Sequence, residues 1–245
     1  MKRVIEIEFQ SNTFTGSRAM GRFLIVLCVA IGLWAALSAV TAPNSARAAA
    51  DANQPAKQEV PEGFVSLFDG KTLDGWKGRS TLWKVADGLI GGETTAEKKL
   101  KHNEFLYTEK EYGDFELLIK FKLRNHNSGV QIRSRVHDAN EFIVKGYQPD
   151  IAEKRYTGIL YEEGGRGILV DVKPDEVAKH VNQGDWNQYR IVCKGDNIQI
   201  FVNDFQTVNY TEKKAGSPTK GVIALQLHAG PPMKVEFKDI FIKEL

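Results

Sequence analysis

Polar side chains able to hydrogen-bond hydroxyl groups or to transfer a proton interrupt a strand-like stretch that begins at residue 145. The segment Lys145–Asp150 places Gln148 and Asp150 two positions apart. Successive side chains of a β-strand point to opposite faces, so these two share one face. The carboxylate of Asp150 is a candidate general base, and the amide of Gln148 is suited to bind hydroxyl groups. The competing interpretation is structural, because an Asp that follows a Pro commonly shapes a turn.

A second group of ionisable side chains follows in the segment Tyr161–Gly167. Alternation allows only one of Glu162 and Glu163 to face a site, and we expect Glu162 in the site and Glu163 in solvent. Arg166 is flanked by glycines, which suits either a loop beside a substrate or plain exposure. Lys145 is a further candidate cation, although alternation places it on the face opposite Gln148.

Two other strand-like runs add candidates for the same face. In the run Asn127–Arg133, Arg133 is suited to hold a developing oxyanion, and an ion pair with Asp150 or a Glu is its competing role. Gln226 and His228 share a face at the end of another strand. His228 is a candidate proton shuttle or metal ligand, although a lone His is more often structural.

These segments form a set of short motifs spread along the chain, together with Gly63–Gly70 near the start and Leu225–His228 near the end. Over about residues 60–245 the pattern resembles the 3-keto-disaccharide hydrolase domain family. The resemblance implies a concanavalin A-like lectin and glucanase sandwich. It also implies cleavage of glycosides whose sugar is already oxidised at C3. The strand-borne carboxylate triplet of ordinary glucanases is missing, which favours different chemistry on the same scaffold.

A ketone at C3 acidifies the C2 hydrogen, so a base can remove it and the enolate can expel the C1 group before water adds. We expect Asp150, His228 and Glu162 to be catalytic. The expected substrate-binding residues are Gln148, Arg133, Gln226, Arg166 and Lys145. A divalent metal ion on Asp150, Glu162 and His228 is a further hypothesis. The glycine-rich segment lacks a following helix pattern, so no nucleotide cofactor is expected. The alternative function is a non-catalytic, lectin-like carbohydrate-binding domain.

The elements that must position these residues are predicted to be β-strands. Short runs of alternating apolar and polar residues are separated by Gly, Asn and Asp, which is the pattern of an all-β protein. We expect two antiparallel sheets packed as a jelly roll, with the polar residues on one concave face. A single helical turn is expected over 174–180. The expected strands cover residues 64–68, 82–85, 89–91, 105–108, 114–123, 129–136, 141–151, 157–161, 167–172, 186–193, 197–202, 206–210, 221–228 and 233–242.

Composition limits the class of protein. The chain has 245 residues, of which 42% are hydrophobic, and its formal net charge is +2. It is long enough for one sizeable core, and the absence of a basic run argues against nucleic acid as a partner. Carbohydrate is the expected partner, and the sequence leaves the oligomeric state open. Beyond the N-terminal region Cys193 is the only cysteine, so no intramolecular disulfide is expected, and we expect Cys193 to be a small core residue.

The N-terminal region has the pattern of an export signal. Residues 23–40 form an apolar run, and an alanine-rich region that resembles a cleavage site follows over residues 46–50. Together they predict a signal peptide over 1–50, with Met20 as an alternative start. A membrane anchor is the competing interpretation. We expect a linker over 51–62, a hydrolase-like sandwich over 63–245, and a periplasmic or extracellular protein without stable membrane association after cleavage.

Overall fold

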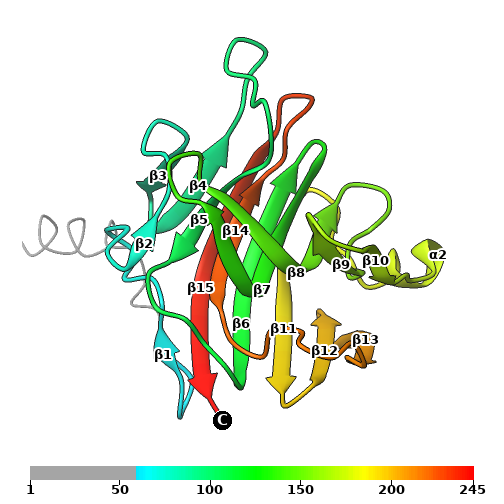
Figure 1. Cartoon of the computed structure of the whole chain (residues 1–245). Coiled ribbons are helices and arrows are strands. Elements are labelled where there is room, and N and C mark those ends of the chain that lie inside the picture. The colour runs from blue at the N-terminus through cyan, green and yellow to red at the C-terminus, as the bar shows by residue number, and fades with distance from the viewer. Residues whose placement is uncertain (1–58) are drawn as a thin grey trace, which may run out of the picture. The chain divides into compact units, whose positions relative to one another are not determined.

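The structure, a computed structural model, describes residues 59–245. The predicted signal peptide, the alternative start at Met20 and most of the linker lie outside the described residues. Within the described part, no helix is both long and apolar enough to cross a membrane. Two antiparallel sheets account for nearly all regular structure there (Figure 1), which confirms the predicted all-β sandwich.

Both sheets are built by antiparallel pairing. In spatial order, the first consists of β13 (Phe205–Thr211), β12 (Asn197–Val202), β11 (Asn187–Lys194), β6 (Phe115–Arg124), β15 (Lys234–Glu244), β4 (Leu89–Glu93) and β3 (Trp83–Ala86), with β1 (Val65–Ser66) paired to β15. The second consists of β10 (Gly167–Val170), β9 (Leu160–Glu163), β8 (Ile143–Ala152), β7 (Asn127–Asp138), β14 (Val222–Leu227), β5 (Glu104–Thr108) and β2 (Trp76–Lys77). The helical turn α2 (Pro174–Val177) begins with the expected proline.

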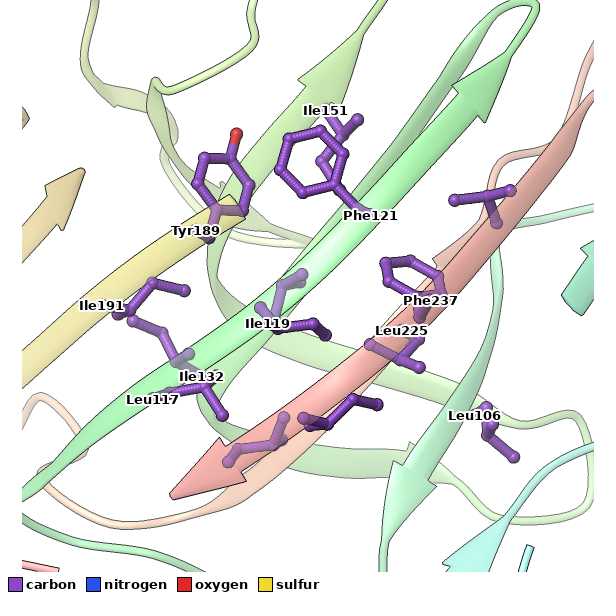
Figure 2. Packing of buried hydrophobic residues seen from close by; sticks show 14 of the residues in the cluster. Leu106, Leu117, Ile119, Phe121, Ile132, Ile151, Tyr189, Ile191, Leu225 and Phe237 are labelled. Carbon is purple, nitrogen blue, oxygen red and sulfur yellow. The ribbon is translucent and has the colours of Figure 1, made fainter. Parts of the chain in front are cut away.

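Apolar alternation on β6 builds the core between the sheets. Every second side chain of β6 from Phe115 to Leu123 is buried. Figure 2 shows Ile119 and Phe121 of this strand in the same cluster as Leu225 of β14 from the opposite sheet, with Phe121 beside Tyr189. Burial of each such side chain contributes about 1.5–3 kcal/mol. Cys193 is fully buried in this core, and burial raises the pKa of its thiol to about 12, which confirms its expected place.

A second apolar cluster lies on the other face of the seven-stranded sheet. It joins Phe105 and Tyr107 of β5, Val144 of β8, and Val222 and Ala224 of β14. In the order of the sheet, β7 and β14 separate β8 from β5, so these side chains meet only if the sheet curls over this face. The backbone N–H of Phe105 also donates to the carbonyl of Phe142, just before β8, at 3.0 Å. The curl makes this face concave. It is therefore the face on which the predicted polar residues are expected.

Candidate active site

Asp150 and Gln148 lie together on the concave face of β8, as their spacing predicted. Gln148 Nε2 donates to Asp150 Oδ1 at 2.7 Å, and Gln131 Nε2 of β7 donates to Gln148 Oε1 at 3.1 Å. Gly129 of β7 is the residue paired with Asp150. A Cβ on Gly129 would lie 2.6 Å from Gln148 Cδ, so only glycine lets Gln148 lie across β7.

The backbone of Asp150 is held from the opposite sheet. Tyr189 of β11 extends through the core, packs against Phe121 with ring centroids 4.7 Å apart, and donates its hydroxyl to the Asp150 carbonyl. The same hydroxyl accepts the N–H of Gly158 at 2.9 Å. Core packing therefore fixes the strand that carries the candidate base.

The protonation of Asp150 is strongly perturbed. Its residue is only 7% exposed, and burial raises the pKa of the carboxyl to about 7. Hydrogen bonds from Gln148 and Asn127 oppose this rise, and the negative charge of Glu163 adds to it. A carboxylate that titrates near neutral pH is suited to both accept and return a proton.

Two buried amides on the same face lack part of their hydrogen bonding. Gln226 is fully buried, and neither its Nε2 nor its Oε1 has a partner among the described residues. The Oε1 of Gln131 also has none. A buried polar atom without a partner costs about 1–3 kcal/mol, so such atoms are normally satisfied by water or by a ligand.

The second carboxylate of this face is Glu163, which corrects the expectation that Glu162 would occupy it. The expected strand over 157–161 instead covers Leu160–Glu163. Leu160 is buried in the core, so alternation turns Tyr161 and Glu163 to the concave face and Glu162 to the other side. Burial raises the pKa of Glu163, while a hydrogen bond from Asn103 and the charge of Lys145 lower it. Counting alternation from Leu160 would have identified Glu163 from the sequence.

Glu162 belongs to a separate network at the sheet edge. It is in register with Tyr147, whose ring is in the main core, and it accepts hydrogen bonds from the side chain and backbone of Arg166. Arg166 also donates to Glu212 Oε2 at 2.5 Å, and the Tyr147 hydroxyl donates to that oxygen at 2.7 Å. Burial raises the pKa of Glu162, but Arg166 outweighs burial and lowers it overall. Arg166 therefore links Glu162 to Glu212 at this edge, and its side chain does not reach the concave face.

Arg133 also differs from the expectation. A register shift between Ile132 and Arg135 interrupts alternation, and Arg133 has a φ of 47°. Its side chain consequently points between the sheets, where it is bonded at both ends of its guanidinium. Nε and Nη1 donate to the carbonyls of Gly113 and Gly195 at 2.9 and 2.6 Å, and Nη2 pairs with Asp114 at 2.7 Å. Arg133 is thus a structural residue rather than a partner of Asp150.

His228 follows β14 and is paired with His126, which lies between β6 and β7. His228 Nδ1 lies 2.6 Å from the Ala229 carbonyl and 3.0 Å from His126 Nε2. The two rings meet edge to face, with centroids 4.6 Å apart. Burial lowers the pKa of His228, and the neighbouring His126 lowers it further, so the ring is neutral near pH 7. The spacing of 102 residues gave no sequence signal for this pair.

Asn103 connects the histidines to the carboxylates. Its Oδ1 accepts the N–H of Ala229 at 2.9 Å, and its Nδ2 donates to Glu163 Oε1 at 3.0 Å. Asn127, which follows His126, is bonded to Asp150. The interactions therefore form a chain of polar groups around one concavity, from Asp150 through the histidine pair to Glu163.

The ligand set suggested for a metal ion does not form. Glu162 faces away from Asp150 and is occupied by Arg166. Among residues 59–245 no three His, Cys, Asp or Glu side chains gather closely enough to hold an ion. The positive charge of Lys145 lowers the pKa of Glu163, so Lys145 lies near the site.

Comparison with known families identifies the fold and the family. Residues 63–243 match the model of the 3-keto-alpha-glucoside-1,2-lyase-like domain. The chain belongs to this family. A family relative from Bacteroides thetaiotaomicron, named 3-keto-disaccharide hydrolase, is 24% identical over 170 residues. The match covers 61% of this chain and 59% of the relative, so the chain spans about three fifths of the relative's length.

Solved structures show the same sandwich. Two candidate glycosyl hydrolases from Parabacteroides distasonis superpose with TM-scores of 0.59 and 0.54 at 22% and 24% identity. They cover 77% and 74% of this chain, and 99% of each of those chains is matched. The carbohydrate-binding module CBM66 from Bacillus subtilis superposes with a TM-score of 0.52 at 14% identity, over 69% of this chain and 96% of that one.

Proposed function

We propose that this protein cleaves 3-keto-glycosides by elimination and hydration, with Asp150 as the base that removes the C2 proton. The observation that carries the proposal is the buried Asp150 carboxyl, whose pKa of about 7 suits reversible proton transfer. Family membership supports the choice of substrate class. Both polar atoms of the Gln226 amide and Oε1 of Gln131 lack a partner among residues 59–245, which supports a hydroxyl-rich ligand on the same face.

The first half of the reaction requires a base and an acid. Asp150 takes the C2 proton, and the electrons of the C2–H bond form the enolate of the C3 ketone. The enolate then returns its electrons to form the C1=C2 bond as the bond from C1 to the leaving oxygen breaks. Glu163, whose pKa is raised by burial, gives its proton to that oxygen. The products are a free alcohol and an unsaturated 3-keto sugar.

The second half adds water across the C1=C2 bond. The oxygen of water bonds to C1, and the protonated Asp150 returns its proton to C2. The proton that this water loses ends on the Glu163 carboxylate, so both carboxyl groups return to their starting states. The sum of both halves is hydrolysis of the glycosidic bond without external oxidant or reductant. An unoxidised glycoside lacks the ketone, so its C2 hydrogen is not acidic enough for this route.

The test compares matched glucosides and 3-keto-glucosides with the purified protein, with and without a chelator. We expect cleavage of the 3-keto compounds alone, and slower release of the alcohol when C2 carries deuterium. Equal cleavage of an unoxidised glucoside would overturn the mechanism. Saturable sugar binding without any cleavage would favour a lectin-like domain instead.

The two adjacent glutamates offer a matched pair of variants. Glu163→Gln is expected to lower kcat by about 10²-fold or more, because a proton donor of the leaving group is lost. Glu162→Gln should keep kcat near that of the wild type and lower the free energy of unfolding by about 1 kcal/mol, since it weakens only the Arg166 network. Steady-state kinetics and urea unfolding measure both effects. A larger loss of kcat in Glu162→Gln would contradict the assignment of faces.

A further inference from the structure

The histidine pair is the part of the concavity to which the first half of the reaction gives no role. His228 Nδ1 lies 2.6 Å from a carbonyl oxygen, which can only accept, so this nitrogen must carry the proton of the neutral ring. The other nitrogen, Nε2, is then unprotonated. None of the hydrogen bonds of the described residues uses it, and it is not among the buried atoms without a partner. An accessible, unprotonated Nε2 is a base ready to accept a proton.

His126 is held firmly beside His228. Asn125 and His126 are the two residues between β6 and β7, and both have positive φ, 63° and 68°. This backbone conformation costs about 1–2 kcal/mol for a residue other than glycine. The Glu153 carboxylate accepts both of their N–H groups, at 3.1 and 3.3 Å, and so stabilises the turn. Such over-determined strain is typical of residues that position a functional group.

The space around His126 Nε2 is also restricted on the other side. Gly230 has a φ of 135°, and a Cβ there would lie 2.8 Å from His126 Nε2. His126 Nε2 lies 3.0 Å from His228 Nδ1 and 3.4 Å from the Ala229 carbonyl. With the proton on His228 Nδ1, the shorter of these contacts has His126 Nε2 as the acceptor. The Ala229 carbonyl favours the proton on His228 Nδ1, and the edge-to-face contact with His126 holds the His228 ring against that carbonyl.

We infer that His228 is the base that activates water in the hydration half of the reaction, and that His126 is a positioning residue that fixes the tautomer of His228. His228 Nε2 takes a proton from water as the oxygen bonds to C1, and protonated Asp150 supplies the proton at C2. The proton on His228 then returns through solvent to Glu163, which restores all three groups. The inference rests on the proposed function, which supplies the unsaturated intermediate.

Loss of hydration has a signature that loss of elimination lacks. His228→Ala should release the alcohol at near the wild-type rate but accumulate the unsaturated 3-keto sugar, which mass spectrometry identifies as lighter by one water. His126→Ala should lower the rate of hydration by about 10-fold or more with little change in KM. His126→Gln, whose amide oxygen can still accept from Nδ1, should restore hydration. His137→Ala, on an exposed part of β7, is the control and should behave as the wild type.

A spectroscopic measurement tests the positioning role apart from activity. ¹⁵N NMR of the five histidines, assigned with the single variants, should show His228 protonated at Nδ1 in the wild type and a mixture of tautomers in His126→Ala. The inference would be overturned if the tautomer of His228 were unchanged in His126→Ala. It would also be overturned if His228→Ala released hydrated sugar without any unsaturated sugar. Failure of the wild type to cleave any 3-keto-glycoside would instead overturn the proposed function, and the tautomer result would still stand on its own.

Discussion

Replacing Asp150 with Asn is expected to lower kcat for a 3-keto-glucoside by about 10²–10⁴-fold, the usual effect of removing a general base. The amide keeps the shape of the side chain and its contact with Gln148, so the sandwich should remain folded. In the wild type, kcat/KM should depend on pH with a bell shape, because Asp150 must be ionised and Glu163 protonated in the same enzyme molecule. Steady-state kinetics over about pH 5–9 check both expectations.

Stability provides the control for this variant, and its sign follows from the same pKa. The folded protein holds the Asp150 proton up to about pH 7, whereas the unfolded chain loses it near pH 4. The contribution of Asp150 to the free energy of unfolding is therefore largest below about pH 4, and it is lost as the pH rises to about 7. At pH 8 this loss amounts to at most about 4 kcal/mol, so Asp150→Asn should be more stable than the wild type there.

Urea unfolding at pH 5 and pH 8 measures the difference in stability. A variant that is inactive but equally or more stable at pH 8 would assign the loss to chemistry. An active Asp150→Asn protein would remove Asp150 from the mechanism. Equal stability changes at both pH values would instead show that the carboxyl is not perturbed in the folded state.

Replacing Arg133 with Met is expected to lower the free energy of unfolding by about 3–5 kcal/mol, because several charge-assisted hydrogen bonds lose their donor inside the protein. Arg133 is 1% exposed and holds Gly113, Gly195 and Asp114, which belong to segments flanking the other sheet. The loss should therefore separate the sheets at this end. Urea unfolding of the purified protein measures it.

Arg135→Met is the matched control, since Arg135 is exposed two positions later on the same strand. It should change stability by less than about 0.5 kcal/mol. Folded Arg133→Met, assayed at low temperature, should keep most of its activity because Arg133 does not face the concavity. Loss of activity without loss of stability would revive the role of Arg133 as an oxyanion partner.

The sequence determined the class of fold and one strand of the site. Period-two alternation in β6 predicted which side chains form the core, and the same period placed Gln148 with Asp150. These predictions succeeded because alternation is a local property of an extended chain. It fails where the strand is irregular, as at the shift between Ile132 and Arg135 that turns Arg133 inward. It also fails where counting begins from the wrong residue, as for Glu162 and Glu163.

Only the tertiary structure decided which distant groups meet. Curling of the seven-stranded sheet around Phe105 and Val144 makes one face concave. The histidine pair and the link from Asn103 to Glu163 then join residues 102 and 60 positions apart. Contacts over such separations depend on strand order and curvature, which no local pattern encodes. Burial likewise sets the pKa of Asp150, because desolvation depends on everything packed around the carboxyl rather than on its neighbours in sequence.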